Sequence, residues 1–227
     1  MTTVRAAPVG EEAQRARIAR RVARELEDGF VVNLGIGLPT LVANYLEPGR
    51  DVIFQSENGL LGLGPRPPAG QEDPDLINAG GGFVTLATGG VFFDSVTSFA
   101  MIRGGFIDLA VLGVLEVDEQ GNLANYLVPG KRTPGIGGGM DLATGARRLI
   151  AATEHVTKDG SPKVVERCRL PLTVAGRVSM VVTDLAVIDV TPRGLVLREL
   201  AEDTTVEEVR AKTGARLLVE GTPARFA

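Results

Sequence analysis

The stretch that decides the fold is residues 30–59, which read FVVNLGIGLPTLVANYLEPGRDVIFQSENG. It holds two β-rich apolar runs, at 30–34 and 52–55, separated by a glycine turn and a segment that opens with proline. Proline suits the first position of a helix, because its missing N–H would be unpaired there anyway. The pattern predicts a strand, a helix over 39–46 and a second buried strand that runs straight into Glu57.

Upstream of this stretch, residues 11–28 carry apolar side chains every four positions, which predicts an amphipathic helix that Gly29 ends. Its basic residues alternate with the apolar ones, so we interpret them as a solvated helix face and not as a phosphate-binding surface. These basic residues are Arg15, Arg17, Arg20, Arg21 and Arg24.

Downstream, strands dominate, and a closing helix begins near Thr205, where Thr205 and Glu208 have capping-box spacing. The segment 191–194 predicts a hairpin turn between the last two strands. The predicted strands are 84–86, 109–115, 149–152, 180–190 and 195–200.

Helices and strands alternate in the first half of the chain, which favours a three-layer α/β/α fold with a mixed sheet. No internal repeat and no long linker interrupts the sequence, so we expect one domain over residues 1–227. We expect its two ends, residues 1–10 and 215–227, to be flexible tails.

Composition excludes several classes of function. The net charge is -4, which gives no support for nucleic-acid binding. One cysteine and one histidine leave no multi-His or Cys-based metal site, so no metal is expected, and the single Cys168 fits a reducing cytoplasm. The N-terminus has no apolar core of signal-peptide length. The uncharged span 76–93 holds five glycines, which favours buried strands with a glycine-rich turn over a membrane helix.

Familiar catalytic and nucleotide-binding motifs are absent or incomplete. His155 has no nucleophile-elbow serine motif to serve, so a structural, hydrogen-bonded role is expected for it. No Walker phosphate loop is present. The turn with Gly35 and Gly37 lacks the third glycine of a dinucleotide loop. It is either a tight strand-to-helix turn or a contact for an anionic group at the start of a helix.

The turn Ser56-Glu57-Asn58-Gly59 is the strongest candidate site. By itself Glu57 is an ordinary turn residue, but the glycine-rich segment 133–142 offers bare backbone amides of the kind that an oxyanion hole requires. A carboxylate is ionised near neutral pH and needs no general base to attack a carbonyl. A carboxylate nucleophile with backbone donors, and with neither a His base nor a metal, suits covalent acyl transfer.

Several further blocks, in order along the chain, resemble the B (beta) chain type of the two-subunit family I 3-oxoacid coenzyme A transferases. The similarity runs from about residue 17 to about residue 213. The matching blocks are 33–40, 56–59, 75–80, 93–95, 98–105, 137–142, 154–155 and 158–163.

The resemblance implies the mixed three-layer sheet shared by CoA-transferases and sugar-phosphate isomerases, with Glu57 as the nucleophile. It implies that Gly137, Gly138, Gly139 and Asn58 form the oxyanion hole or acyl-binding site. It places Gly35, Gly37, Gly80 and Gly81 at the coenzyme A site. From the residues alone, Asn58 has two equal alternatives, to contact the acyl oxygen or to brace the turn, while Asn33 is expected to be structural.

The resemblance also implies partners and substrates. Coenzyme A is expected as a substrate, with no permanently bound cofactor. The expected partner is the alpha subunit of the CoA-transferase, in a cytoplasmic A2B2 heterotetramer, with no nucleic acid and no membrane. Succinyl-CoA or acetyl-CoA is the expected donor, and acetoacetate or 3-oxoadipate the expected acceptor, in ketone-body or 3-oxoadipate metabolism.

This sequence departs from the family pattern at three positions. Gly81 stands where members often have lysine, Phe106 where they often have histidine, and Gly139 where they often have alanine. Loss of the lysine affects affinity and substrate choice more than reaction type. Two alternatives share the fold: an isomerase-like enzyme with Glu57 as general base, and a non-enzymatic ligand sensor. A transferase-like chain that has lost its activity is a third.

Overall fold

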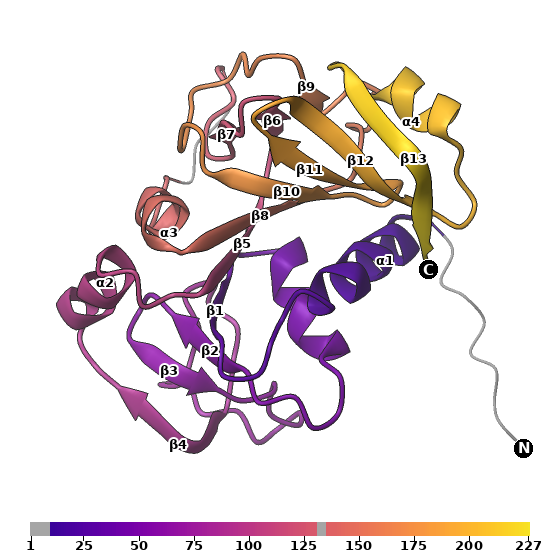
Figure 1. Ribbon diagram of the computed structural model, residues 1–227. Helices are drawn as coiled ribbons and strands as arrows, with labels where there is room; N and C mark the ends of the chain where they lie inside the picture. Colours follow the sequence, from indigo (N-terminus) through magenta and orange to yellow (C-terminus); the bar gives the residue numbers. More distant parts are fainter. Residues whose placement is uncertain (1–9, 131–134) are drawn as a thin grey trace, which may run out of the picture.

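The computed structural model describes residues 10–130 and 135–227 (Figure 1). The helical elements are α1 (Glu11–Ala23), the 3-10 helix η1 (Leu38–Tyr45), α2 (Ser95–Arg103), α3 (Gly139–Gly145) and α4 (Val206–Lys212). The strands of the large sheet are β1 (Val31–Leu34), β2 (Ile53–Ser56), β3 (Leu60–Leu63), β4 (Leu86–Phe92), β5 (Leu109–Gly113), β8 (Arg148–Ala152), β10 (Val178–Val182), β11 (Ala186–Thr191), β12 (Gly194–Ala201) and β13 (Leu217–Phe226). A second sheet holds β6 (Glu116–Asp118), β7 (Leu123–Ala124) and β9 (Val164–Val165).

The large sheet has ten strands, in the order β13-β12-β11-β10-β8-β5-β1-β2-β3-β4. Its centre, from β10 to β2, is parallel, whereas β11, β3 and β4 each run antiparallel to a neighbour. Because β1 and β2 are parallel neighbours, their carboxyl ends meet at one edge of the sheet. Crevices at such an edge are the usual ligand sites of open α/β sheets.

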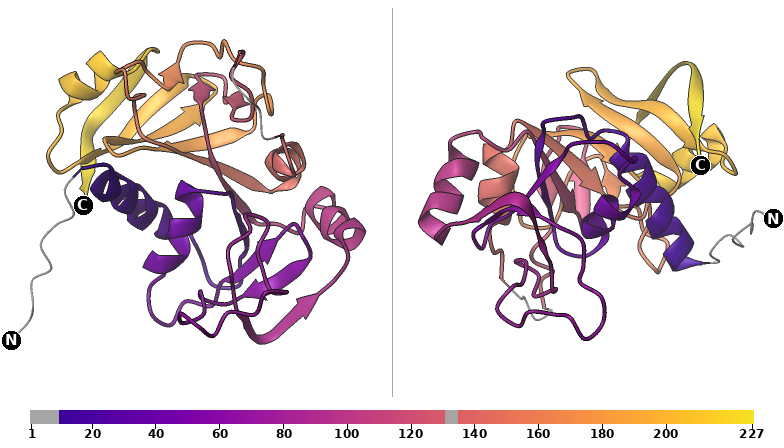
Figure 2. Two further views of the ribbon diagram at one scale, coloured as in Figure 1. Left: turned by 180° about the vertical axis from the view of Figure 1, so that it is seen from behind. Right: turned by 90° about the horizontal axis from the view of Figure 1, so that it is seen from below.

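Side chains of the central strands alternate between two hydrophobic cores. Along β5, Ala110 and Leu112 enter one core, while Leu109 and Val111 enter the other. Strands buried on both faces read as continuous apolar runs, as this one does. Helix α1 and η1 contribute to one core, and α2, α3, α4 and the small sheet to the other, on opposite sides of the strands (Figures 1 and 2). The predicted three-layer mixed α/β/α fold is confirmed.

Several predicted boundaries are wrong in instructive ways. The first helix ends at Ala23 and not at Asp28, because residues 24–26 continue in tighter i→i−3 bonds that still bury Leu26. The basic face of this helix is not wholly solvated, since Arg21 is buried and paired with Glu25 and Glu199.

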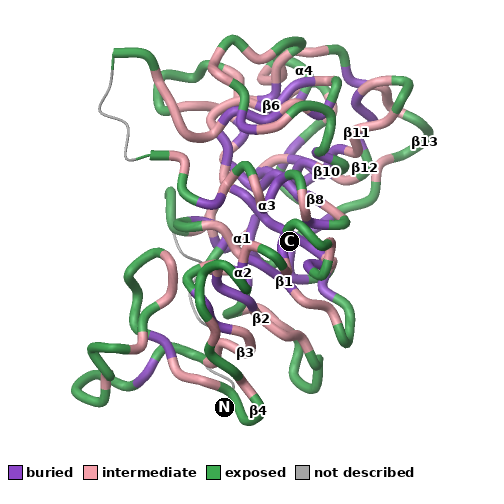
Figure 3. The backbone as a smooth tube through the Cα atoms, turned by 90° about the vertical axis from the view of Figure 1, so that its left-hand side faces the viewer, coloured by how far each residue is buried: buried purple, intermediate pink, exposed green. Residues whose placement is uncertain are grey.

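Three predicted strands are also redrawn. The run 180–190 is two antiparallel strands, β10 and β11, because Thr183 turns the chain and its hydroxyl accepts the amide of Ala186. The run 109–115 splits, with residues 116–118 entering the small sheet. The strand expected at 84–86 starts only at Leu86, continues through the glycines at 89 and 90, and is largely exposed (Figure 3). It is therefore not the buried strand that was predicted.

The expected flexible tail over residues 215–227 is wrong. Residues Leu217–Phe226 form β13, which pairs in parallel with β12, and Phe226 is only 1% exposed. Burial of that aromatic ring in the core with α1 supplies the apolar contact that keeps the end of the chain ordered. Of the N-terminal tail, residues 1–9 lie outside the described part of the chain.

The two predicted turn features at the C-terminal end are confirmed. Thr191 and Gly194 close the hairpin between β11 and β12. Thr205 caps α4, and its hydroxyl accepts the amide of Glu208.

Candidate active site

The turn that carries Glu57 is held by close contact with the backbone that precedes α2. Gly59 has φ +118°, and a Cβ there would overlap the Phe93 carbonyl oxygen. The amide of Phe93 donates back to the Gly59 carbonyl at 3.0 Å. Only glycine satisfies both the backbone angle and the space, so the final residue of the Ser-Glu-Asn-Gly motif has a structural cause. Glu57 itself is half-buried at the exit of β2.

A chain of buried amide and hydroxyl groups leads to Glu57. The Asn33 Nδ2 lies 2.6 Å from Gln55 Oε1 and 3.4 Å from Glu57 Oε2. In turn, Gln55 Nε2 donates to Ser98 Oγ at 2.9 Å. Asn33 and Gln55 are buried in β1 and β2, and Ser98 is buried in α2. Asn33 was expected to be only structural; a polar side chain within an apolar strand was the signal of its contact with Glu57.

The glycine-rich segment reaches the same carboxylate. A methyl group added at Gly138 would sit 3.3 Å from Glu57 Cγ and 3.2 Å from Phe99 Cζ. Such contacts are tight, so glycine allows the backbone of residue 138 to lie directly against Glu57. Gly139 faces Thr173 instead, and its amide donates to the Ile136 carbonyl. Of the three glycines predicted here, the structure thus brings Gly138 against Glu57, and residues 131–134 of the same segment lie outside the described residues.

Glu57 lines a pocket of about 450 Å³ at the carboxyl ends of β1 and β2. Three of the glycines predicted to bind coenzyme A line it, namely Gly35, Gly80 and Gly81. The fourth, Gly37, does not line it, although it adjoins the lining residue Ile36. Apolar side chains that include Leu34, Phe54, Leu63, Phe83 and Val84 cover much of the wall.

Asn58 lies outside this pocket lining and braces the turn. Its Nδ2 donates to the Ile77 carbonyl at 2.8 Å, and the residue is exposed. The same region is pinned a second time, because the Ala79 amide donates to Ser56 Oγ at 2.9 Å. Of the two alternatives for Asn58, the bracing contact is the one present in the structure.

The segment 78–82 forms a closed loop that uses its own amides. The Asn78 amide donates to the Gly82 carbonyl, and the Gly81 amide donates to the Asn78 carbonyl. The Asn78 Oδ1 accepts the amides of Gly80 and Gly82, at 2.9 and 3.0 Å. Gly81 has φ +76°, so a side chain at this departure from the family pattern would be strained.

The remaining candidate groups are structural. His155 is fully buried, and its ring nitrogens lie 2.9 Å from the hydroxyls of Thr183 and Thr213. Burial, with a smaller contribution from Lys212, lowers the pKa of His155 to about 4, so the ring is neutral near pH 7. Burial, together with Asp118 and Glu116, raises the pKa of Cys168 to about 12, which makes it a poor nucleophile.

Within residues 10–130 and 135–227, no group of three or more His, Cys, Asp or Glu side chains could hold a metal ion. No helix in the same ranges is long and apolar enough to cross a membrane.

Fold and site together define a three-layer α/β protein with a carboxylate at the carboxyl edge of a parallel sheet, opposite bare glycine backbone. A family model described as coenzyme A transferase matches residues 15–212. The chain is 56% identical to the beta subunit of the acetate CoA-transferase of Escherichia coli K12, covering 89% of this chain and 93% of that one. It is 54% identical to the second, or B, chain of a probable succinyl-CoA:3-ketoacid coenzyme A transferase of Bacillus subtilis, with 90% and 95% covered.

A solved structure shares the fold. It is an acyl-CoA transferase of Escherichia coli O157:H7 in a thioester complex with CoA, with a TM-score of 0.71 and 21% sequence identity. The match covers 99% of this chain but 44% of that longer chain, so this chain spans less than half of it. The chain therefore belongs to the coenzyme A transferase family, and the relatives that match it along nearly their whole length are beta subunits of two-subunit enzymes.

Proposed function

We propose that this chain is the beta subunit of a 3-oxoacid type CoA-transferase and that Glu57 is the residue that becomes covalently acylated. The observation that carries the proposal is the contact of the Glu57 side chain with the Gly138 backbone beside an apolar pocket. A nucleophilic carboxylate must have open space in front of it and hydrogen-bond donors for the oxyanion that its attack creates.

In the first half-reaction, a Glu57 oxygen attacks the thioester carbonyl of a donor acyl-CoA. The C–S bond breaks, which leaves an acyl-glutamyl anhydride and the CoA thiolate. The thiolate attacks the Glu57 carbonyl carbon, and the C–O bond to the acyl group breaks. The products are a Glu57–CoA thioester and the donor carboxylate. An acceptor carboxylate reverses these steps, so the thioester energy is conserved without ATP and the kinetics are ping-pong.

Residues of this chain position the reacting carboxylate. The Asn33 amide limits the rotation of Glu57 by contacting Oε2, and Gln55 and Ser98 hold that amide in turn. The backbone amides at Gly137 and Gly138 are the proposed oxyanion donors, because the amide of Gly139 is already bonded to Ile136. One such donor is typically worth about 10² to 10³ in rate.

The pocket on this chain is one part of the proposed site. Its relatives are named as the second of two subunits, which supports a complementary alpha subunit. In the proposal, the assembly holds two copies of each chain. Succinyl-CoA or acetyl-CoA as donor and acetoacetate or 3-oxoadipate as acceptor are the proposed pairs. The pocket of about 450 Å³ with mainly apolar walls suits short acyl chains.

The test is the intact mass of this chain after it is mixed with an acyl-CoA in the presence of the alpha subunit. The proposal expects a CoA-sized adduct, which borohydride reduces irreversibly at Glu57. The adduct should be absent from Glu57→Ala and present in Glu27→Ala, a control at an exposed glutamate after α1. An isomerase or a sensor would form no adduct in any variant, and full turnover by Glu57→Ala would reject the assignment.

A further inference from the structure

We propose that Arg66 is the anion-binding residue of the Glu57 pocket, where it holds a carboxylate or phosphate group of the substrate remote from the reacting carbon. This inference rests on the proposed function. Arg66 follows β3 and lines the same pocket as Glu57. Among the described residues that line this pocket, Arg66 is the only cation and Glu57 the only anion.

The chemistry of the proposed reaction calls for such a cation. Both the nucleophile and the acceptor acid are carboxylates, so an acid that approaches Glu57 meets a like charge. Coenzyme A adds further negative charge through its phosphates. A fixed positive group on the pocket wall offsets this repulsion and orients the substrate. Arginine suits the task because its planar guanidinium pairs bidentately with carboxylates and phosphates.

The glycine loop opposite cannot supply this positive charge through its backbone. All five amides from Asn78 to Gly82 donate within the protein, to the Gly82 carbonyl, to Ser56 Oγ, to the Asn78 carbonyl and twice to Asn78 Oδ1. The Gly35 amide donates to the Val111 carbonyl at 2.8 Å. These groups shape the pocket, but their N–H bonds are not directed at a ligand.

The segment that carries Arg66 is anchored, while its side chain has no competing charge. The Pro65 carbonyl accepts both the amide and the hydroxyl of Thr85, at 3.0 and 2.7 Å, and the Gly64 amide donates to the Thr85 carbonyl. None of the ion pairs among the described residues involves Arg66, which is exposed. A guanidinium on an anchored segment, with no internal carboxylate partner, is available to a ligand.

The experiment compares Arg66→Gln and Arg66→Lys with the wild type, each reconstituted with the alpha subunit. The matched control is Arg24→Gln, an exposed arginine after α1 that does not line the pocket. The value of kcat/KM is measured for acids with one carboxylate, for acids with a second carboxylate at the far end, and for acyl donors on CoA or on pantetheine, which lacks the phosphates.

We expect Arg66→Gln to lower kcat/KM by about 10- to 100-fold for the substrates that carry the bound anion, the worth of one charge-assisted hydrogen bond. Arg66→Lys should recover part of this loss. A loss confined to dicarboxylic acids assigns the anion to the far carboxylate. A loss seen with CoA donors but not with pantetheine donors assigns it to a phosphate.

Two results would overturn the inference. One is an Arg66→Gln variant that behaves like Arg24→Gln with every substrate. The other is an equal loss for neutral-tailed and anionic substrates that lysine does not relieve, which would mean a structural role. Failure of the proposed function is distinguishable, because the wild type itself would then show neither turnover nor adduct.

Discussion

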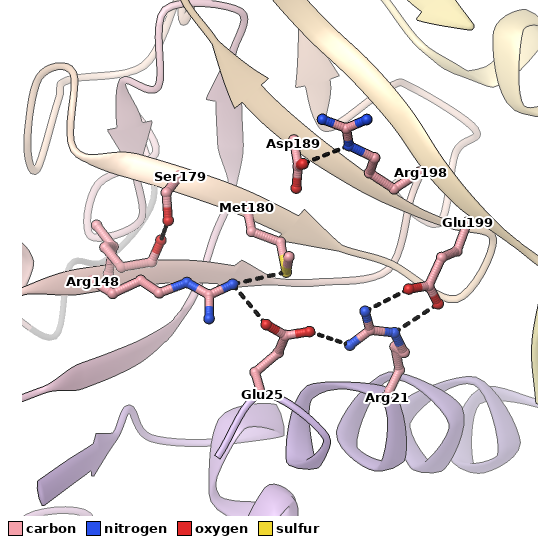
Figure 4. Close-up of polar contacts among 9 residues, drawn as sticks. Arg21, Glu25, Arg148, Ser179, Met180, Asp189, Arg198 and Glu199 are labelled. Carbon is pink, nitrogen blue, oxygen red and sulfur yellow. Dashed lines mark hydrogen bonds and ion pairs between the residues drawn. The ribbon is translucent and has the colours of Figure 1, made fainter. Parts of the chain in front are cut away.

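Two half-buried polar clusters in this protein treat their carboxylates in opposite ways. Between α1 and the sheet, Glu25 accepts charged hydrogen bonds on both oxygens, from Arg21 at 2.6 Å and from Arg148 at 2.7 Å (Figure 4). Arg21 also forks onto both oxygens of Glu199. At the pocket, by contrast, Glu57 has one long contact from the neutral amide of Asn33 among the described residues.

The difference teaches what separates a structural charge from a reactive one. Burial raises the pKa of Glu25, but the hydrogen bonds from Arg21 and Arg148 outweigh it and leave the pKa below its usual range. Its lone pairs are occupied and its position is set by its arginine neighbours. Glu57 keeps lone pairs directed at open space, which is the condition for a nucleophile. Four predictions break or sharpen this contrast, from the largest expected effect to the smallest.

The same chemical change at the two carboxylates should have opposite results. Glu57→Gln keeps the shape of the side chain but loses the nucleophile, so turnover should fall by about 10⁴-fold or more. Its free energy of unfolding should stay within about 0.5 kcal/mol of the wild type. Glu25→Gln should lower stability and leave kcat unchanged. Initial rates and urea titrations of both variants measure this, and a Glu57→Gln enzyme with more than about a tenth of normal kcat would contradict it.

Removal of the central arginine should leave two carboxylates without their best partner. Arg21→Ala is expected to lower the free energy of unfolding by about 3 kcal/mol, in the range for a broken buried pair. The exposed neighbour Arg24→Ala serves as the control and should change it by less than about 0.5 kcal/mol. Denaturant titration of the purified protein decides. Equal effects at the two arginines would mean that the network contributes no more than a surface charge.

His155 tests the same distinction for a buried group that stays neutral. Its pKa of about 4 lies below the ordinary 6.5, so between these values only the unfolded chain takes up the proton. The free energy of unfolding should fall as the pH drops through this window, by up to about 3 kcal/mol, with no further loss from this group below it. Since the chain has one histidine, His155→Gln should flatten the slope between pH 6.5 and about 5. Identical slopes would refute the assignment.

The smallest change concerns the space in front of Glu57. The methyl group of Gly138→Ala should press on Glu57 Cγ and Phe99 and lower kcat by about 10- to 100-fold through misplacement of the carboxylate. Gly139→Ala is the matched control, because its methyl group would meet Thr173 at an ordinary 3.8 Å. That variant should keep nearly normal kcat. The assay is the steady-state transfer rate, and similar rates for both variants would show that Gly138 is not close to the reaction.

Local patterns predicted much of the fold. The apolar runs of β1, β2, β5 and β8 and the cap of α4 were visible in the sequence, because each depends on a few consecutive residues. The errors lie where distant contacts decide. Residues 215–227 look like a polar tail, and they became a strand only because β12 offers an unpaired edge and the core takes up Phe226. The glycines of β4 similarly suggest a turn, yet Gly90 allows close approach to Gly62 of β3.

By itself, the sequence determined the three-layer order of helices and strands and the carboxylate at a strand exit, since periodicity and turn chemistry are local properties of the chain. Only the tertiary structure decided that Gly138 lies against Glu57, that Asn33 reaches it, and that Arg66 shares its pocket. It also decided that Arg21 is a buried partner and not a solvated charge. The physical reason is that strand order and layer packing, which set distances between remote residues, depend on the free energy of the whole assembly of elements.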